Sequence, residues 1–287
     1  MEQAQNTGPA WELHAGRYQD TLGDVTADAL IVDAPYSARM HGGHDRAPTV
    51  GDTYSRTTHG THRGGQTGRG TAERVRNGKR KREYDTPRRA ISYDGWRPED
   101  VRECVAWCAP RVRGWMVSIT DHILAPAWAD AMAEAEIGRY VFAPLVWYAP
   151  GSRVRLAGDG PSCWCCWIIV SRPRTGEDRT GRPWSRWGTL PGGYAIPSDR
   201  LSTVVGSKPL ALMRALVRDY TRPGDLVLDP CAGGGTTGRA ALLEGRRFVG
   251  AEIDAETARA ARERLAQPYT PPLISEAPTR TQGALDV

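Results

Sequence analysis

The stretch DLVLDPCAGGGTTGRAALLEG, residues 225–245, joins a short apolar run to a helical pattern through three consecutive glycines. The apolar run predicts a buried strand that ends at Asp229, and the following helix is expected to begin near Thr236. Glycines 233–235 let the backbone come close to a ligand, and the N-terminus of a helix offers free N–H donors. The turn is neither a GxGxxG motif nor a phosphate-binding loop, because no lysine follows the glycines. This stretch therefore predicts a βα unit with a ligand site at its turn.

The same alternation of apolar runs and helical patterns continues along most of the chain. Such runs fit strands that are buried on both faces, as in a parallel sheet covered by helices. In one helical segment, Ser207 is expected to cap the helix and Pro209 to lie in its first turn. The pattern predicts a Rossmann-like, doubly wound α/β fold with a mostly parallel sheet. The expected strands are 28–33, 113–120, 140–148, 163–170, 225–229 and 247–254, and the expected helices are 98–110, 122–136, 207–220, 236–245 and 254–267.

Basic charge is concentrated in one segment of the 287-residue chain. Hydrophobic residues make up 40% and charged residues 25%, which are ordinary values for a globular protein. Residues 37–95 hold thirteen Lys and Arg against six Asp and Glu, hence +7, whereas the whole chain carries +5. This segment has almost no aliphatic residues, so we expect a mobile basic insertion that contacts a polyanion. A solvated loop without a partner is the alternative.

The six cysteines are expected to be reduced core residues. Cys104 and Cys108 are four residues apart, so they should share one face of a helix. Neither the cysteines nor the pairs His41/His44 and His59/His62 favour a metal site. No apolar run is long enough to cross a membrane and no signal-peptide pattern is present, so a cytoplasmic location is expected.

A second stretch, ALIVDAPYSARM (29–40), ends an apolar run on an acid, a proline and a tyrosine. A third feature is Glu252, which ends the next predicted strand after the glycine turn, with Asp254 beyond it. An acid at this place can accept hydrogen bonds from both ribose hydroxyls of an adenosine ligand. The glycine turn and the acid together favour a nucleoside-containing ligand.

These motifs resemble those of the amino-directed DNA methyltransferases. DPCAGGGTT…GAEID resembles the family's S-adenosylmethionine motif, DAPY resembles its catalytic tetrapeptide, and GSKPLALM (206–213) resembles its lysine-proline motif. Their order, with the catalytic motif before the cofactor motif, resembles the circularly permuted β group. The resemblance covers 11–36, 96–173 and 206–266. The cofactor-binding residues that it implies are Asp229, Pro230, Cys231, Ala232, Gly233, Gly234, Gly235, Thr236, Thr237, Glu252, Asp254, Ser207, Lys208 and Pro209.

The resemblance implies that Asp33, Ala34, Pro35 and Tyr36 are catalytic. An exocyclic amine is a poor nucleophile because its lone pair is delocalised into the ring of the base. The Asp33 carboxylate and the Ala34 carbonyl would accept its hydrogens and free that lone pair, while Tyr36 would stack on a base flipped out of the duplex. Alanine stands where the family usually has proline, but it keeps the carbonyl.

The preferred function is S-adenosylmethionine-dependent methylation of adenine N6 in duplex DNA, in an orphan or a restriction–modification system of a bacterium or phage. An aspartate at the first tetrapeptide position is commoner among adenine enzymes of the family. The alternatives are cytosine-N4 methylation, a methyltransferase that acts on RNA or on a protein amide, and a non-catalytic DNA-binding relative. Two departures stand out. Cys231 replaces a phenylalanine, and Arg17 replaces the acid that contacts the cofactor adenine, for which Asp20 is a weak substitute.

The resemblance also divides the chain into regions. The catalytic domain is expected to comprise 1–36, 96–173 and 206–267, with a basic DNA-contacting arm at 37–95, a small target-recognition region at 174–205 and a loose tail at 268–287. Trp184 and Trp187 are equally compatible with packing and with DNA contact. The family resemblance suggests a homodimer on double-stranded DNA. No membrane is expected as a partner, because no long apolar run is present. The predicted DNA-binding residues are Arg39, Arg46, Arg174, Arg179, Arg182 and Arg186.

Overall fold

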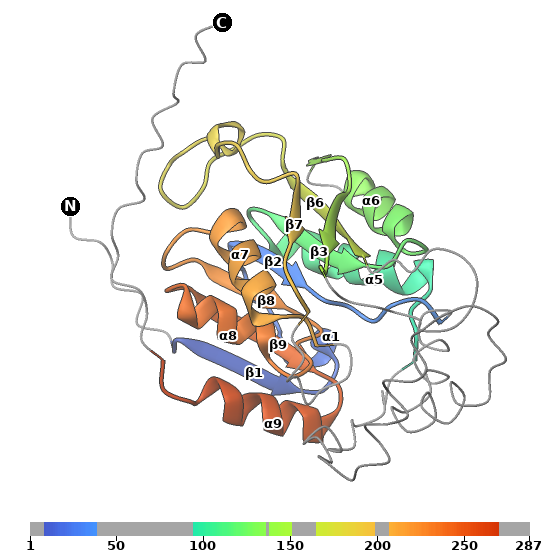
Figure 1. Ribbon diagram of the computed structural model, residues 1–287. Helices are drawn as coiled ribbons and strands as arrows, with labels where there is room; N and C mark the ends of the chain where they lie inside the picture. The colour runs from blue at the N-terminus through green and yellow to red at the C-terminus, as the bar shows by residue number, and fades with distance from the viewer. Residues whose placement is uncertain (1–8, 39–93, 136–137, 151–164, 199–206, 270–287) are drawn as a thin grey trace, which may run out of the picture.

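The computed structural model describes residues 9–38, 94–135, 138–150, 165–198 and 207–269. Its centre is a nine-stranded sheet in the order β1-β9-β8-β2-β3-β6-β5-β7, with β4 also paired to β6 (Figure 1). The strands are β1 Trp11–Ala15, β2 Ala29–Val32, β3 Met116–Thr120, β4 Arg139–Val141, β5 Leu145–Tyr148, β6 Cys165–Pro173, β7 Gly193–Ala195, β8 Leu226–Asp229 and β9 Arg247–Glu252. The helices are α1 Tyr18–Thr21, α5 Pro98–Cys108, α6 Ala125–Glu134, α7 Leu210–Tyr220, α8 Thr236–Leu243 and α9 Ala255–Leu265, with 3₁₀ turns at Ala109–Arg111 and Trp184–Arg186.

The sheet is parallel from β1 through β3, and β6 is its antiparallel member. β6 pairs antiparallel with β3, β4 and β5, whereas β7 pairs in parallel with β5. The five strands β1, β9, β8, β2 and β3 therefore end at one edge, which we call the carboxyl edge, and begin at the opposite edge, the amino edge. The predicted Rossmann-like, doubly wound and mostly parallel sheet is confirmed.

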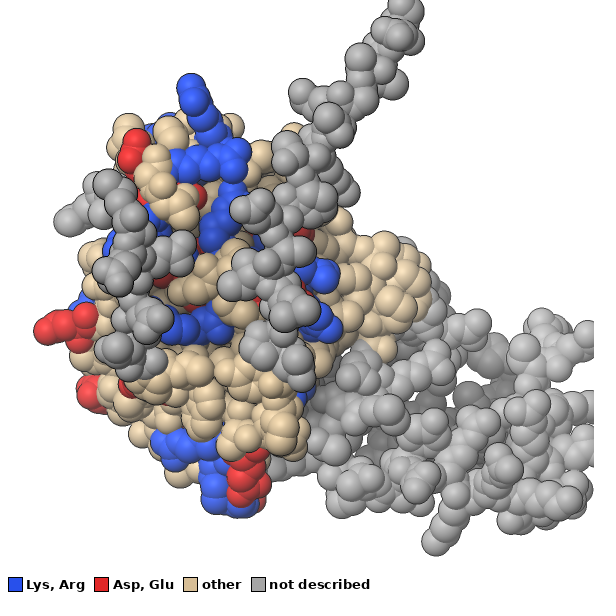
Figure 2. Space-filling model, turned by 90° about the vertical axis from the view of Figure 1, so that its left-hand side faces the viewer, with Lys and Arg blue, Asp and Glu red and all other residues tan. Residues whose placement is uncertain are grey.

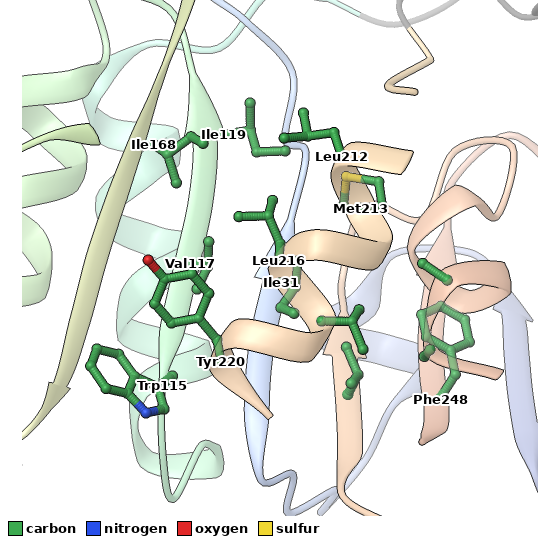
Figure 3. Packing of buried hydrophobic residues seen from close by; sticks show 14 of the residues in the cluster. Ile31, Trp115, Val117, Ile119, Ile168, Leu212, Met213, Leu216, Tyr220 and Phe248 are labelled. Atoms are coloured by element: carbon green, nitrogen blue, oxygen red, sulfur yellow. The ribbon is translucent and has the colours of Figure 1, made fainter. Parts of the chain in front are cut away.

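Helices cover both faces of the sheet and form two apolar cores. On one face, α7, α8 and α9 pack against the strands, and Figure 3 shows Leu212, Met213 and Leu216 of α7 over Ile31 and Val117 of the sheet. On the other face, α1, α5 and α6 complete the second core. The central strands are buried on both sides, because β2 and β3 have no exposed residue. This burial explains the uninterrupted apolar sequence of β2, whereas β3 also buries Ser118 and Thr120.

Within the described residues the cysteines are reduced as predicted, and Cys104, Cys108 and Cys166 are buried, but Cys165 and Cys231 are partly exposed. Cys104 and Cys108 lie on one face of α5 with their Sγ atoms 4.0 Å apart, and both are buried. All five described cysteines are free thiols. None of the helices that the structure describes has both the length and the apolar character needed to cross a bilayer.

Two local predictions are wrong. The run 140–148 forms two strands, β4 and β5, that break before Pro144, a residue without a backbone N–H to donate to a ladder. The helix α7 begins at Leu210 with Pro209 as its N-cap, so Ser207 does not cap it. Instead, Ser207 Oγ lies 3.1 Å from Thr236 Oγ1, in the first turn of α8. Ser207 thereby connects the segment before α7 to the glycine turn.

Candidate active site

Two acids that are far apart in the sequence lie beside each other at the carboxyl edge. Asp33 follows β2 and Asp229 ends β8, and these strands pair in parallel with Leu30 opposite Leu228. The chain order of the strands reverses here, since β2 leads to β3 on one side and β8 leads to β9 on the other. Ligands of open α/β sheets bind at such a reversal. The structure therefore brings the tetrapeptide and the glycine turn to one place.

Asp33 forms an ion pair with Lys208. The Lys208 Nζ atom lies 2.7 Å from Asp33 Oδ1 and 2.8 Å from Oδ2. The lysine side chain is 8% exposed and the aspartate side chain 22%, so the pair faces a space that water can reach. The same Nζ atom lies 4.6 Å from the centroid of the Tyr36 ring. Lys208 thus contacts both the acid and the aromatic ring of the tetrapeptide.

Tyr36 and the residue after it are held by neighbouring strands. The Tyr36 hydroxyl donates to Cys166 Sγ on β6 over 3.0 Å. The Ser37 N–H donates to Asp121 Oδ2, just after β3, over 2.7 Å, and the other carboxylate oxygen of Asp121 accepts from the backbone at the start of α6. Burial raises the pKa of Tyr36 well above its ordinary value, so the hydroxyl stays protonated. Strands β2, β3 and β6 therefore fix the orientation of the tetrapeptide.

The glycine turn has the conformation that its sequence requires. Gly233 and Gly235 have φ of 50° and 73°, which is the left-handed region that favours glycine. A Cβ atom on Gly235 would also come within 3.3 Å of the Ala261 Cβ on α9. Arg264 of α9 braces the turn, because its Nη1 donates to the Gly234 carbonyl over 3.1 Å and to Thr236 Oγ1 over 2.9 Å. The turn thus holds the N-terminus of α8 at the carboxyl edge.

Glu252 lies beside this turn and still has free acceptor capacity. Its Oε2 accepts from the Gly233 N–H over 2.8 Å and its Oε1 from the Asp254 N–H over 2.9 Å. The Ile253 N–H also bonds to this carboxylate, and because a carboxylate has about four lone-pair sites, Glu252 can still accept a hydrogen bond from a ligand. Asp254 is the N-cap of α9, where its Oδ1 accepts from the Thr257 N–H over 2.8 Å. Asp254 therefore orients the loop that presents Glu252.

Burial sets the protonation of the acids at this edge. It raises the pKa of Asp229 to about 7, although hydrogen bonds from Thr237 and the Cys231 N–H act in the opposite direction. Burial also raises the pKa of Glu252 and of Asp33, and the Lys208 ammonium partly offsets the rise at Asp33. Carboxylates with raised pKa values in one cleft are typical of functional sites.

A cleft of about 850 Å³ connects these groups. Its wall includes members of all three predicted motifs, and also residues from β1 to α1 and from the start of α5 that sequence reasoning did not assign. Ala34, Tyr36, Pro209 and Gly235 do not line it, although each adjoins a residue that does. The predicted residues that line it are Asp33, Pro35, Ser207, Lys208, Asp229, Pro230, Cys231, Ala232, Gly233, Gly234, Thr236, Thr237, Glu252 and Asp254.

Arg17 lies at the rim of this cleft, where the resembling family has an acid. Its Nη2 is 3.5 Å from Glu103 Oε1 of α5, and the Gln19 side-chain amide donates to the same oxygen over 2.7 Å. Glu103, Gln19 and Arg17 all line the cleft, whereas Asp20 does not. No sequence signal distinguishes Glu103, because an acid on a helix is usually a solvated surface residue.

The predicted DNA-binding residues do not gather at the cleft. Because β6 is antiparallel, its last residue, Pro173, lies at the amino edge. The Arg174 N–H that follows donates to the Gly138 carbonyl there. Arg179 Nε lies 3.2 Å from Asp225 Oδ1, just before β8. Arg182 and Arg186 belong to the same loop, which contains the 3₁₀ turn Trp184–Arg186. Figure 2 shows Lys and Arg side chains at the top of the molecule and others spread over the same face. Arg39 and Arg46 lie outside the described residues.

The two tryptophans of this loop are packing residues. Trp184 and Trp187 are 6% and 7% exposed and stack on each other at 5.7 Å between ring centroids. Trp187 also packs edge-on against Trp115 at 5.7 Å, and its indole N–H donates to the Asp219 carbonyl over 2.7 Å. Of the two alternatives that the sequence left open for these side chains, the structure supports packing.

Comparisons with known proteins find similarity to DNA methyltransferases over the segment that forms much of the cleft. Residues 196–263, which hold the lysine-proline motif, the glycine turn and Glu252, match the N6_N4_Mtase family model, described as DNA methylase. DNA adenine methyltransferase YhdJ of Escherichia coli (strain K12) is 39% identical over 80 residues. That match covers 27% of this chain and 27% of the relative, so the chain aligns with about a quarter of YhdJ's length.

Solved structures share the fold over nearly the whole chain. The M1.HpyAVI–SAM complex has a TM-score of 0.57 at 18% identity and covers 89% of this chain and 99% of its own. The cytosine-N4-specific PvuII DNA methyltransferase has a TM-score of 0.51 at 14% identity and covers 90% and 89%. The chain therefore has the class I methyltransferase fold. Its resemblance to the amino-directed DNA methyltransferases is confirmed by the family model and by YhdJ.

Proposed function

We propose that this chain is a DNA amino-methyltransferase that transfers the methyl group of S-adenosylmethionine to the N6 amine of a flipped adenine in duplex DNA. The observation that carries the proposal is the meeting of the acid–aromatic tetrapeptide and the glycine turn in one cleft. The family match over the turn and the adenine specificity named for YhdJ support it.

The residues present fit S-adenosylmethionine. Glu252 keeps acceptor capacity for the ribose hydroxyls, and the tight glycine turn leaves room for the backbone to approach the ligand. The cleft is large enough for a nucleoside with an amino-acid tail and extends from Glu252 to Asp33. Bound S-adenosylmethionine supplies an electrophilic methyl group on a sulfonium sulfur. Glu103 and Gln19 are the candidates for contact with its adenine, in place of the missing acid at Arg17.

The tetrapeptide binds and activates the amine. Asp33 accepts one amine hydrogen and the Ala34 carbonyl accepts the other, so the lone pair leaves the ring and becomes nucleophilic. Tyr36, whose hydroxyl is fixed on Cys166, stacks on the flipped base. The product amine gives up one proton, for which we assign the Asp33 carboxylate as acceptor.

The choice of adenine rests on Asp33 and on YhdJ, because the fold is common to adenine-N6 and cytosine-N4 enzymes. Binding to duplex DNA through the basic segment 37–95, and action as a homodimer, belong to the same proposal. A non-catalytic DNA-binding relative is the competing function, and it predicts DNA binding without binding of the methyl donor.

Transfer of a tritiated methyl group from the donor to unmethylated duplex DNA tests the proposal. We expect incorporation that is stable to protease and released as N6-methyladenine by nuclease digestion. Release as N4-methylcytosine would correct the base, and label on RNA but not on DNA would correct the substrate. Binding of DNA with neither donor binding nor incorporation would favour the non-catalytic relative.

A further inference from the structure

Lys208 occupies the two contacts that the proposed reaction requires of its substrate. Its Nζ atom lies 2.7 and 2.8 Å from the two oxygens of Asp33, and 4.6 Å from the centroid of the Tyr36 ring. In the proposed function, on which this inference rests, the same carboxylate accepts a hydrogen of the target amine and the same ring stacks on the base. An ammonium group and an aromatic amine are both nitrogen donors of similar size. They cannot occupy the same position beside Asp33.

The backbone keeps Lys208 between the tetrapeptide and the glycine turn. Its neighbour Pro209 is the N-cap of α7, and its other neighbour, Ser207, has its Oγ 3.1 Å from Thr236 Oγ1. The side chain crosses from this anchored segment to Asp33 and is almost fully buried. A lysine stem has four methylene groups with free rotation. The ammonium can therefore leave Asp33 without any movement of α7.

We propose that Lys208 is a positioning residue that stands in for the target amine before DNA binds. It keeps Asp33 ionised and the base position filled, and the entering base must displace it from the carboxylate. Base entry is thus an exchange of one nitrogen donor for another, so the buried carboxylate is never left without a partner. An unpaired buried charge is strongly unfavourable, which gives the exchange its physical reason.

The charges around Asp33 make the effect of Lys208 measurable. Lys208 supplies the positive charge that lowers the pKa of Asp33, while burial raises it. Removal of the ammonium therefore raises this pKa further. When the pH is lowered, activity that needs the ionised carboxylate is then lost at a higher pH than in the wild type. The other ionisable groups that face Asp33 or its neighbours are Tyr36 after β2, Asp121 after β3, Cys166 on β6, Asp229 at the end of β8, Cys231 after β8, and Glu252 on β9.

The test compares Lys208→Met with the wild type in methyl transfer to unmethylated genomic DNA between pH 5.5 and 9, at saturating donor. We expect the acid limb of kcat/KM for DNA, which reports the enzyme before DNA binds, to move to higher pH, with kcat/KM at least about tenfold below wild type at pH 6 and no such loss at pH 9. On the alkaline side, KM for DNA should fall several-fold, because the base no longer competes with the ammonium. Lys208→Arg should restore the acid limb.

Arg214→Met is the matched control, because it removes a basic group of α7 that is ion-paired with Glu244 over 2.6 Å outside the cleft. Its pH profile should coincide with that of the wild type. An unshifted acid limb in Lys208→Met, together with an unchanged KM, would overturn the inference while leaving the proposed function intact.

Titration of the Asp33 carboxyl carbon by NMR in the protein without DNA gives a readout that needs no activity. Its signal is assigned by its loss in Asp33→Asn, and Lys208→Met should raise the midpoint. A wild-type protein without methyl transfer at any pH would overturn the proposed function instead. In that case the titration alone decides whether Lys208 holds Asp33 ionised, and equal midpoints in the two proteins would refute it.

Discussion

The two edges of the sheet both contain buried charge, but they use it differently. At the carboxyl edge, Asp33, Asp229 and Glu252 line an open cleft, and their pKa values are raised. At the amino edge, Asp225 is enclosed, since it pairs with Arg179 and accepts from the Arg222 N–H over 2.7 Å. Burial raises the pKa of Asp225 as well. A perturbed acid therefore marks a site only where a cleft gives a ligand access to it.

Aromatic residues show the same contrast. Tyr36 at the carboxyl edge has a ring face in contact with the Lys208 ammonium, which we propose the target base displaces. At the amino edge, Trp115 lies among Trp187, Phe142 and Tyr220 with ring centroids 5.2 to 5.7 Å apart, and Figure 3 shows Trp115 beside Tyr220. The aromatic ring at the carboxyl edge is the one for which we propose a substrate contact, whereas the rings at the amino edge pack against one another.

The largest difference is expected between Asp33→Asn and Asp225→Asn. Asparagine at Asp33 keeps the shape but loses the charge that accepts from the amine, so kcat should fall about a thousandfold with the fold intact. The same change at Asp225 should leave kcat within a few-fold and lower the free energy of unfolding. Methyl-transfer assays and urea unfolding of both variants measure this. Equal losses of kcat would abolish the distinction between the edges.

Trp187→Ala should lower stability but leave the binding of S-adenosylmethionine unchanged. The side chain is buried between Trp115 and Trp184, so its removal leaves a cavity and should lower the free energy of unfolding by about 3–5 kcal/mol. Below the melting temperature, the affinity for S-adenosylmethionine should stay at the wild-type value. Denaturant unfolding and calorimetric titration check the two halves, and weakened donor binding in the folded variant would contradict the assignment of Trp187 to packing.

Glu252→Gln tests the cofactor side of the carboxyl edge. The amide has one acceptor oxygen fewer and turns its own N–H groups toward backbone N–H groups. Binding of S-adenosylmethionine should therefore weaken by about 1.5–3 kcal/mol, or roughly 10- to 150-fold. Glu244→Gln is the control, since Glu244 is also buried but pairs with Arg214 away from the cleft. Donor affinity that changes equally in both variants would argue against a ribose contact at Glu252.

The smallest effect is expected for Arg179→Met. This arginine side chain is 46% exposed, so loss of its pair with Asp225 should cost only about 0.2–1 kcal/mol of stability. If the amino edge does not touch DNA, the dependence of DNA affinity on salt should be unchanged. A slope reduced by about 0.9 would show instead that Arg179 neutralises a phosphate, as its position in the sequence had predicted.

Local sequence was sufficient to predict the βα turn, because an apolar run, three glycines and a later acid are together compatible with a strand, a tight turn and a helix. The tetrapeptide was recognisable for a similar reason. The ion pair of Lys208 with Asp33 and the bond of Tyr36 to Cys166 were not predictable, since they join residues more than a hundred positions apart. The arginines at 174–186 were expected near the substrate because the sequence does not show that β6 runs antiparallel. That single reversal sends their loop to the amino edge.

Single-molecule sequencing of DNA from a methylation-free host that expresses this protein tests the central claim most directly. The assignment of methyl transfer to the carboxyl edge predicts N6-methyladenine at a defined sequence motif with the wild type and none with Asp33→Asn. No modified base with the wild type, or the same modified motif with Asp33→Asn, would contradict it.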